Sequence, residues 1–441
     1  MRNMEQRALE LQNKLENKNA TIGVVGLGYV GLPLAVEKAK AGFKVIGFDV
    51  QKEKVDKVNA GENYIGDVIP ADLEQLVKSR QLTATADYSF IKDVDAVAIC
   101  VPTPLDIYKQ PNMNYVKSSA QAVADHITPG TLVVLESTTY PGTTEELIKP
   151  ILEEKGFKIG IDIFLAYSPE RVDPGNKDFN TKNTPKVVGG VTESCTKIAA
   201  TMYRTVLDGD VHEVSSPAVA EMEKLLENTF RNINIALANE MAILCNKMEI
   251  DVWEVIDAAA TKPYGFMPFY PGPGLGGHCI PIDPWYLTWK AREYNYHTKL
   301  IETAGEINDS MPEFVVQRCM EILNEQGKSL KGSKVVVMGI AYKKDIDDYR
   351  ESPVIPILKK LSQFGAEWTV VDPHIPRFKL ENKEIRTVEI SNQLLQEAEL
   401  VLIATNHSMF EYDKIMEASK AVLDTRNIYN KAYKSGTYFK L

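Results

Sequence analysis

A glycine-rich turn between a short apolar strand and a helix constrains the fold of this chain more than any other feature. The strand spans 21–25, the turn reads GLGYVG over 26–31, and a helical pattern follows over 32–41. A second strand, 44–48, ends at Asp49. This order of strand, GxGxxG turn, helix, strand and acid is the order that a dinucleotide site requires. A GxGxxG alone is a weak signal, and a packing turn is the alternative.

Each position of the turn has a physical reason. Gly26 allows the tight turn, Gly28 lets a pyrophosphate approach the backbone, and Gly31 allows close helix packing. The helix N-terminus then faces the phosphates. Asp49 can bind a ribose 2′-hydroxyl and disfavours a 2′-phosphate, so the turn predicts NAD. The predicted cofactor-binding residues of this unit are Gly26, Gly28, Tyr29, Val30, Gly31 and Asp49.

The alternation of strands and helices continues beyond the turn. Apolar strands at 95–101 and 131–135 run into Pro102-Thr103-Pro104 and Glu136-Ser137-Thr138. Ligands of open parallel sheets lie beyond the carboxyl ends of strands. Thr103, Ser137 and Thr138 are therefore further cofactor candidates, with ordinary turn chemistry as the alternative.

Composition excludes several classes of protein. The 441 residues indicate two or three domains, and the net charge of −10 argues against a nucleic-acid binder. The five cysteines are widely spaced with no CxxC pair, so we expect no metal site and a reduced, cytoplasmic compartment. The polar N-terminus predicts no signal peptide, and no apolar run is long enough for a membrane span.

A long helical pattern at 217–248 carries both apolar and polar candidates. Lys224 and Asn228 lie four residues apart, on one side of the helix, and Arg231 lies close to that side. The helix also contains asparagines that need partners if they are buried, namely Asn228, Asn232, Asn234 and Asn239. A helix this long and apolar is expected to span between domains and to pack against a second subunit, which predicts a homodimer. Lys224 as an ordinary surface lysine is the alternative.

Two loops carry reactive side chains. The stretch 270–285 reads YPGPGLGGHCIPIDPW, and it places Cys279 between glycines and prolines with Asp283 four residues later. A thiol on a rigid loop suits a nucleophile, although free cysteines are often small buried residues. Glu170 and Arg171 follow the strand 164–166 in a proline-restricted loop, where a solvated ion pair is the alternative.

The last third of the chain restarts an α/β unit. Strands are predicted at 334–338, 367–371 and 401–404, with a helix at 353–364. Gly339-Ile340-Ala341 replaces GxGxxG, so a phosphorylated nucleotide other than NAD is expected there. Basic residues follow the first strand and can face phosphates or the first domain, or can belong to a solvated charged loop; they are Lys343, Lys344 and Arg350.

The predicted fold class is therefore α/β, with two Rossmann-like parallel-sheet domains joined by a long central helix and helical region. The predicted boundaries are a polar N-terminal helix or tail at 1–19, an NAD-binding domain at 20–212, a central helical dimerisation region with the cysteine loop at 213–325, and a nucleotide-binding domain at 326–441.

This combination indicates a dehydrogenase that acts on a nucleotide-linked substrate. Oxidation of an alcohol to an aldehyde needs no covalent step, but a thiolate that adds to the aldehyde gives a thiohemiacetal, which can lose a second hydride. Such a site needs a thiolate (Cys279), a cation for the oxyanion (Lys224), and carboxylates for protons and water (Glu170, Asp283).

The motifs GLGYVGLPLA, ESTTYPGTT, SPERVDPG, GLGGHCIPIDP and AYKKDIDDYRES, with the Lys224–Asn228 helix, resemble the nucleotide-sugar 6-dehydrogenase family, which includes UDP-glucose and GDP-mannose dehydrogenases. The resemblance runs from about residue 20 to residue 430. It implies an NAD domain, a central dimerisation region and a UDP-binding domain. It also implies a four-electron oxidation of the sugar C6 hydroxyl with two NAD.

The resemblance also implies roles for individual residues. Cys279 would be the nucleophile, Lys224 and Asn228 would hold the oxyanion or the sugar, Asp283 would transfer protons through water, and Glu170 would act in thioester hydrolysis. Thr138 would position water beside the cofactor, Lys343 would contact substrate, and Arg350 would lie near the nicotinamide. Arg231 and Gly276 are further candidates for substrate binding, and we hypothesise that Arg171 and nearby loop atoms accommodate an acetamido group on the sugar.

Two departures from UDP-glucose members favour a UDP-N-acetylhexosamine. Arg171 follows Glu170 where those members carry an apolar residue, and His278 precedes the cysteine where serine is common. UDP-N-acetylglucosamine is the leading substrate hypothesis, and UDP-N-acetylgalactosamine, UDP-N-acetylmannosamine and UDP-glucose are the competitors. Two other classes stay open: a two-electron hydroxyacid-type dehydrogenase, and a nucleotide-sensing protein with a decayed site.

Overall fold

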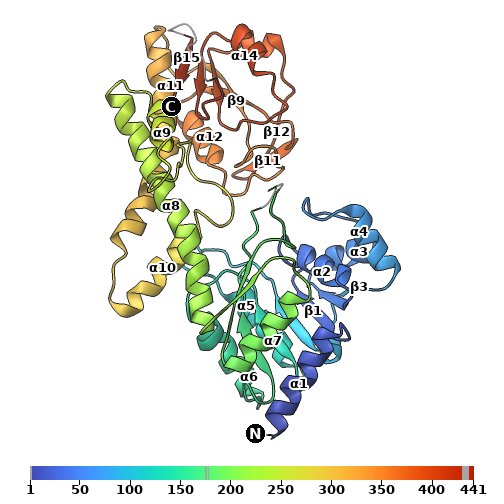
Figure 1. Ribbon diagram of the computed structural model, residues 1–441. Helices are drawn as coiled ribbons and strands as arrows, with labels where there is room; N and C mark the ends of the chain where they lie inside the picture. The colour runs from blue at the N-terminus through green and yellow to red at the C-terminus, as the bar shows by residue number, and fades with distance from the viewer. Residues whose placement is uncertain (1, 174–175, 177, 430–436) are drawn as a thin grey trace. The chain divides into compact units, whose positions relative to one another are not determined.

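The computed structural model describes residues 2–173, 176, 178–429 and 437–441. The described chain forms two compact units (Figure 1): unit 1 comprises 1–227 and 285–296, and unit 2 comprises 228–284 and 297–441. Met1 of the predicted N-terminal segment and Pro174 and Gly175 of the SPERVDPG motif lie outside the described residues. The domain boundaries drawn from the sequence stay a prediction.

Unit 1 is built on an eight-stranded sheet in the order β3-β2-β1-β4-β5-β6-β7-β8. Its strands are β1 (Thr21–Val25), β2 (Lys44–Phe48), β3 (Leu82–Thr85), β4 (Ala96–Ile99), β5 (Leu132–Leu135), β6 (Phe164–Tyr167), β7 (Lys186–Gly190) and β8 (Val211–Val214). The first six strands are parallel. Because β7 pairs antiparallel with β6 and parallel with β8, the last two strands run the opposite way.

Helices cover both faces of this sheet. One apolar core joins the sheet to α1 (Arg2–Glu16), α2 (Gly31–Lys40) and α7 (Glu193–Arg204), and the other joins it to α5 (Asn114–Ala124) and α6 (Lys149–Glu154). Leu11 and Leu15 are buried in the first core, so α1 is docked on the unit. The other helical segments of unit 1 are α3 (Lys52–Ala60), α4 (Pro70–Lys78), η1 (Tyr88–Asp93), η2 (Thr144–Ile148) and η3 (Arg292–Tyr294).

Unit 2 has a five-stranded parallel sheet in the order β10-β9-β13-β14-β15. Its strands are β9 (Lys334–Met338), β10 (Glu367–Val371), β13 (Leu400–Ile403), β14 (Val422–Asp424) and β15 (Tyr438–Lys440), beside a hairpin of β11 (Arg377–Leu380) and β12 (Lys383–Arg386). One core contains α11 (Lys299–Glu325) and α12 (Val354–Gln363), and the other contains α13 (Asn392–Glu397) and α14 (Tyr412–Ala418). Helix α9 (Val252–Ala260) also belongs to this unit.

The first strand of each unit is followed by the same kind of glycine turn. In unit 1, Gly26 has φ +92° and donates its N–H to Phe48 O at 2.7 Å. In unit 2, Gly339 has φ +85° and donates to Val371 O at 2.8 Å. Each strand therefore leaves its sheet through a left-handed glycine, which a residue with a Cβ rarely adopts. The predicted fold class, with two Rossmann-like units and a long helix, is confirmed.

Helix α8 (Pro217–Lys247) matches the predicted helix, and α8 and α10 (Asp283–Ala291) each contribute residues to both units. Among the described helices, none combines the length and the apolar character that crossing a bilayer demands.

Candidate active site

The glycine turn of unit 1 leaves room where a phosphate would lie. A Cβ on Gly26 would lie 2.4 Å from Cys100 O, and a Cβ on Gly31 would lie 1.8 Å from Gly26 O, so both positions need glycine for packing. A Cβ on Gly28 would meet no atom within 4 Å. The first turn of α2 carries no acidic residue that would compete with an anion. The turn therefore fits a pyrophosphate at the N-terminus of α2.

Asp49 lies beside the glycine turn and can bind the ribose of the cofactor. Its carboxylate is buried and accepts the backbone N–H groups of Leu27 at 2.9 Å and Gln51 at 2.8 Å. A carboxylate offers about four lone-pair positions, so two backbone donors leave capacity for a ribose hydroxyl. Lys54 lies 3.6 Å from the same carboxylate.

A matched pair of variants separates packing from cofactor binding in this turn. We expect Gly31→Ala to lower the free energy of unfolding by about 1–3 kcal/mol, because its Cβ would overlap backbone. We expect Gly28→Ala to keep the wild-type melting temperature and to weaken NAD binding. Calorimetric titration with NAD and thermal unfolding measure the two effects. Unchanged NAD affinity in Gly28→Ala would contradict the assignment of Gly28.

The predicted hydroxyls at the carboxyl edge bind protein atoms. Ser137 Oγ donates to Val101 O at 2.7 Å and accepts Val101 N–H at 2.9 Å. Thr103 Oγ1 donates to Thr138 O at 2.7 Å, and the buried Tyr286 hydroxyl donates to Thr103 O. These bonds tie the ends of β4 and β5 together. The side chain of Thr138 is half-buried at this edge.

Glu170 is held in a fixed orientation. Its Oε1 accepts the N–H groups of Arg171 at 2.8 Å and Val172 at 2.9 Å, and its Oε2 contacts Lys186 Nζ at 3.3 Å. Three donors therefore fix the carboxylate within the loop that follows β6.

Arg171 binds protein groups of unit 1, and its predicted contact to the sugar stays a prediction. Its guanidinium donates to Glu227 on α8 through Nε and Nη2, and to Pro185 O at 2.9 Å. Burial disfavours the charged guanidinium, yet its hydrogen bonds with Glu227 outweigh this and raise the pKa of Arg171. Burial, together with the nearby Glu227, raises the pKa of Glu223 to about 7. Arg171 thus ties the Glu170 loop to α8.

Helix α8 carries the predicted cation and amides. Lys224 is buried and Arg231 is exposed. The expectation that buried asparagines find partners is met in unit 2: Asn228 Nδ2 donates to Asp283 at 2.5 Å, and Asn232 Nδ2 donates to Ile280 O at 3.1 Å. Asn239 accepts Gly272 N–H at 3.0 Å. Three asparagines of α8 therefore hold the cysteine loop and the residues that follow it.

The cysteine loop packs through its glycines. A Cβ on Gly276 would lie 2.4 Å from Tyr342 Cβ, and a Cβ on Gly277 would lie 2.8 Å from the Tyr342 ring. Gly276 therefore contacts Tyr342, while its predicted contact to substrate stays a prediction. Cys279 is exposed, and its carbonyl accepts Asp283 N–H at 2.8 Å, so the thiol lies one turn before α10. The other four cysteines are buried and free.

Arg350 and Lys343 belong to the segment after β9 in unit 2, and Arg350 affects His278 of the cysteine loop. Arg350 pairs with Asp348 at 2.7 Å, and its carbonyl accepts Gly277 N–H at 3.3 Å. Burial, reinforced by the nearby Arg350 guanidinium, lowers the pKa of His278. His278 is therefore favoured in its neutral form. Lys343 is half-buried in the segment after β9.

Arg426 is a candidate that the sequence reasoning missed. It follows β14 at the carboxyl edge of the unit 2 sheet, donates through Nε to Ala404 O at 2.8 Å, and lies beside Gly272, where a Cβ would be 2.9 Å from Nη1. Burial lowers its pKa to about 10. A basic residue two positions after a short apolar strand in a nucleotide-binding unit is the signal that would have found it.

Asp372, the carboxylate that follows the second strand of the unit 2 sheet, is paired with protein groups. Asp372 occupies the position that corresponds to Asp49, and its Oδ2 accepts Ile340 N–H at 2.7 Å and contacts His407 Nε2 at 3.2 Å. Burial alone would raise its pKa, but the hydrogen bond with His407 and the backbone donors outweigh this and lower the pKa of Asp372. His407 Nδ1 accepts Asp345 N–H at 3.0 Å, so both ring nitrogens are used. Asp372 thus contacts a histidine in addition to its backbone donors.

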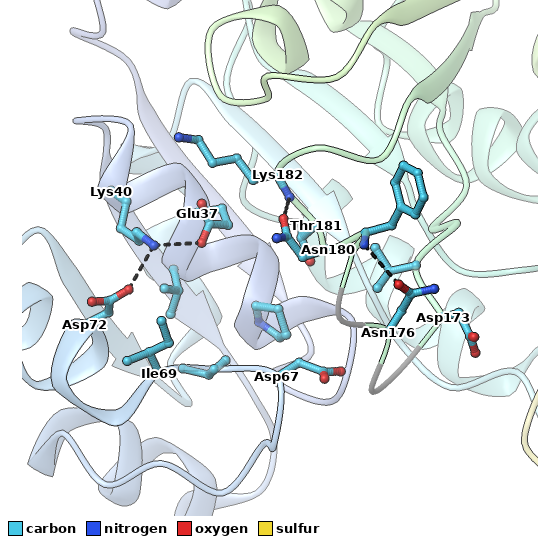
Figure 2. A pocket seen from close by; sticks show the side chains of 15 residues that line it. Glu37, Lys40, Asp67, Ile69, Asp72, Asp173, Asn176, Asn180, Thr181 and Lys182 are labelled. Atoms are coloured by element: carbon cyan, nitrogen blue, oxygen red, sulfur yellow. Dashed lines mark hydrogen bonds and ion pairs between the residues drawn. The ribbon is translucent and has the colours of Figure 1, made fainter. Parts of the chain in front are cut away.

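A pocket of about 330 Å³ lies elsewhere in unit 1, lined by residues of α2, the segment 67–72 and the segment after Arg171 (Figure 2). Its Lys40 pairs with Glu37 at 3.1 Å and with Asp72 at 2.8 Å. Among the described lining residues, none is a predicted site residue. We assign this pocket no part in the chemistry.

Comparison with known proteins identifies the family of this chain. Three models of the UDP-glucose/GDP-mannose dehydrogenase family match consecutive parts of the chain: the NAD binding domain at 20–207, the central domain at 218–310 and the UDP binding domain at 336–431. The chain belongs to the UDP-glucose/GDP-mannose dehydrogenase family. Its glycine turn therefore lies in the family's NAD binding domain, and Arg426 lies in its UDP binding domain.

Relatives within the UDP-glucose/GDP-mannose dehydrogenase family differ in their sugar. A UDP-N-acetyl-D-glucosamine 6-dehydrogenase of Pseudomonas aeruginosa is 37% identical over 81% of this chain and 84% of its own. A UDP-N-acetyl-D-mannosamine dehydrogenase of Campylobacter jejuni is 37% identical over 91% and 99%. The solved structure of a UDP-D-ManNAc dehydrogenase from Pyrococcus horikoshii has a TM-score of 0.87 at 32% identity, covering 95% and 98%. This chain is accordingly an NAD-dependent nucleotide-sugar dehydrogenase.

Proposed function

We propose that this enzyme oxidises the C6 hydroxyl of a UDP-N-acetylhexosamine to the carboxylate, with UDP-N-acetylglucosamine as the best candidate. The observation that carries the proposal is the exposed Cys279 thiol on a glycine-packed loop, directly before a helix whose first acid, Asp283, is hydrogen-bonded to Asn228. A thiol is needed only if the aldehyde is oxidised further.

Four electrons leave the sugar in two steps. The alcohol loses a hydride and a proton and becomes an aldehyde. The Cys279 thiolate adds to the aldehyde carbon, and the resulting thiohemiacetal loses a second hydride and becomes a thioester. Water then adds, the C–S bond breaks, and the acid and the thiolate are released. When bound, NAD accepts one hydride in each oxidation, so two NAD and one water are consumed per sugar.

In unit 1, Lys224 supplies the positive charge that stabilises the oxyanion of the thiohemiacetal, and Glu170 takes the proton of the hydrolytic water. Preorganised donors are effective at such positions because they need no reorganisation during the reaction. Lys224 is buried and Glu170 is fixed by three donors, which supports these roles. Thr138, half-buried at the carboxyl edge, positions water beside the cofactor.

In unit 2, Asn228 orients Asp283, and Asp283 transfers protons through water. Lys343 and Arg426 follow strands β9 and β14, where phosphates bind in open parallel sheets, and we propose that they neutralise the UDP pyrophosphate. Arg350 contacts the nicotinamide end of the cofactor, while Arg231 and Gly276 contact the substrate.

A panel of UDP-sugars tests the proposal. We expect two NADH per UDP-N-acetylglucosamine consumed, with the uronic acid as product, and higher kcat/KM than for UDP-N-acetylgalactosamine, UDP-N-acetylmannosamine or UDP-glucose. One NADH per sugar would favour a two-electron dehydrogenase. A lack of turnover across the panel would favour a nucleotide-sensing protein.

Arg171 is proposed to select the acetamido sugar through the loop that it anchors. Because Arg171 holds this loop on Glu227, we expect Arg171→Leu to lower kcat/KM for UDP-N-acetylglucosamine about tenfold more than for UDP-glucose. Arg204→Leu, which breaks the exposed ion pair with Glu213, is the matched control. An unchanged preference in Arg171→Leu would contradict this role.

The enzyme is proposed to be a homodimer through α8. In unit 2 this helix exposes Phe230, Leu237 and Leu244, whose spacing of seven residues puts them on one side. We expect a double variant, Leu237→Glu with Leu244→Glu, to shift the mass measured by light scattering from two chains to one. Glu240→Ala, at another exposed position of α8, should leave the mass unchanged. A double variant that keeps the wild-type mass would rule out this face.

The compartment is proposed to be the cytoplasm. The free cysteines fit a reduced environment, which keeps Cys279 available as a thiol.

A further inference from the structure

Four charged side chains and a tyrosine form a buried cluster at the carboxyl edge of the unit 1 sheet. Lys186 Nζ lies 2.9 Å from Glu136 and 3.3 Å from Glu170. Glu136 is fully buried, accepts the Tyr203 hydroxyl at 2.6 Å, and lies 3.6 Å from the buried Lys38. Lys186 is therefore the residue that links the buried acid to the proposed catalytic acid.

The reversed direction of β7 creates this link. Glu136 directly follows β5, and Glu170 follows β6 by three residues, so both lie at the carboxyl edge of the parallel strands. Lys186 is the first residue of β7. Because β7 runs antiparallel to β6, its first residue lies at the same edge as the end of β6. In a wholly parallel sheet, the first residue of β7 would lie at the opposite edge.

The charges in the cluster identify Lys186 as its stable cation. Burial disfavours the ammonium of Lys186, but the charges of Glu136 and Glu170 outweigh burial and raise its pKa. For Lys38, burial dominates and lowers the pKa, and Lys186 adds to the effect. Burial alone would raise the pKa of Glu136, yet Lys186 and Lys38 lower it. The cluster therefore keeps Lys186 charged beside two carboxylates.

We propose that Lys186 is a positioning residue for thioester hydrolysis, holding Oε2 of Glu170 so that the carboxylate stays correctly oriented. The proposal rests on the proposed function, in which Glu170 takes a proton from the water that attacks the thioester. The backbone donors hold only Oε1. Without Lys186, the carboxylate can rotate about its side-chain bonds and loses its only charged partner at Oε2 in the described contacts.

The experiment removes Lys186 together with the buried carboxylate that it neutralises, and it leaves Lys38, whose pKa burial lowers, without Glu136. A single Lys186→Met change would leave the buried Glu136 carboxylate without its closest cation, and such a buried charge strongly destabilises a fold. The variant of choice is therefore Lys186→Met with Glu136→Gln. We expect the first two NADH per active site to form at close to the wild-type rate. We expect steady-state turnover to fall about tenfold or more, because a mispositioned base loses part of its usual contribution. Intact-protein mass spectrometry should then find a thioester on Cys279.

Three further variants make the result specific. Lys186→Arg keeps a cation at Oε2 and should restore most of the turnover. Lys182→Met, which removes an exposed lysine paired with Asp208 at 3.1 Å, should behave as wild type. Glu170→Gln should trap the same thioester. If it traps none, or if the wild type yields one NADH per sugar, the proposed function itself fails.

The inference about Lys186 is overturned by a different result. If Glu170→Gln traps the thioester but the Lys186→Met, Glu136→Gln variant turns over at the wild-type rate with no adduct, then Lys186 only neutralises Glu136. A similar loss in Lys186→Arg and in the double variant, without any adduct, would also overturn it.

Discussion

Replacing Cys279 by serine should abolish the four-electron reaction. A serine hydroxyl is a far weaker nucleophile than a thiolate at neutral pH, so the aldehyde is not held for the second hydride transfer. We expect kcat to fall by about a thousandfold or more, in line with the loss of other nucleophiles. The sugar that does react should yield at most one NADH. Rapid-quench assays that follow NADH, aldehyde and acid together measure this.

The control for this change is another cysteine of unit 2. Cys245 is buried in α8 and has no part in the mechanism, so Cys245→Ser should keep two NADH per sugar. Formation of two NADH per sugar at the wild-type rate by Cys279→Ser would eliminate the covalent route.

Replacing Lys224 by methionine should have the next largest effect. Methionine keeps the length of the side chain and removes the charge that we propose stabilises the developing oxyanion. Removal of one preorganised oxyanion donor typically costs about 10²–10³ in kcat, and Lys224 is buried, where such a charge acts strongly. We expect kcat and kcat/KM to fall together, which steady-state kinetics can measure.

Lys247→Met is the matched control, because Lys247 is an exposed lysine at the end of the same helix. It should leave both kinetic constants unchanged. A rise in KM with unchanged kcat in Lys224→Met would make Lys224 a ground-state binding residue instead.

Local patterns predicted the parts of the fold that depend on short segments. Gly26 and Gly31 must be glycine because a Cβ at either position would overlap neighbouring backbone. Asp49 accepts Leu27 N–H and so holds the turn against the end of β2. The amides of α8 were expected to need partners, because a buried amide without a hydrogen bond is costly. Asn228 and Asn232 find those partners in the cysteine loop and the start of α10.

These local patterns did not predict which residues remote in the sequence contact each other. No sequence pattern paired Arg171 with Glu227, which its guanidinium binds although the two lie 56 residues apart in the sequence. The strands β7 and β8 reverse direction, and the sequence of a short buried strand contains no signal for its direction. Arg426 became a candidate only when β14 brought it beside Gly272.

The sequence by itself determined the family, the NAD turn and the order of the two nucleotide-binding units, because each depends on residue types at short, fixed spacing. The tertiary structure alone decided which charges meet. Lys186 reaches Glu136 and Glu170 because an antiparallel strand begins where parallel strands end. Electrostatic interactions depend on distance in space, and distance in space between remote residues is set by packing.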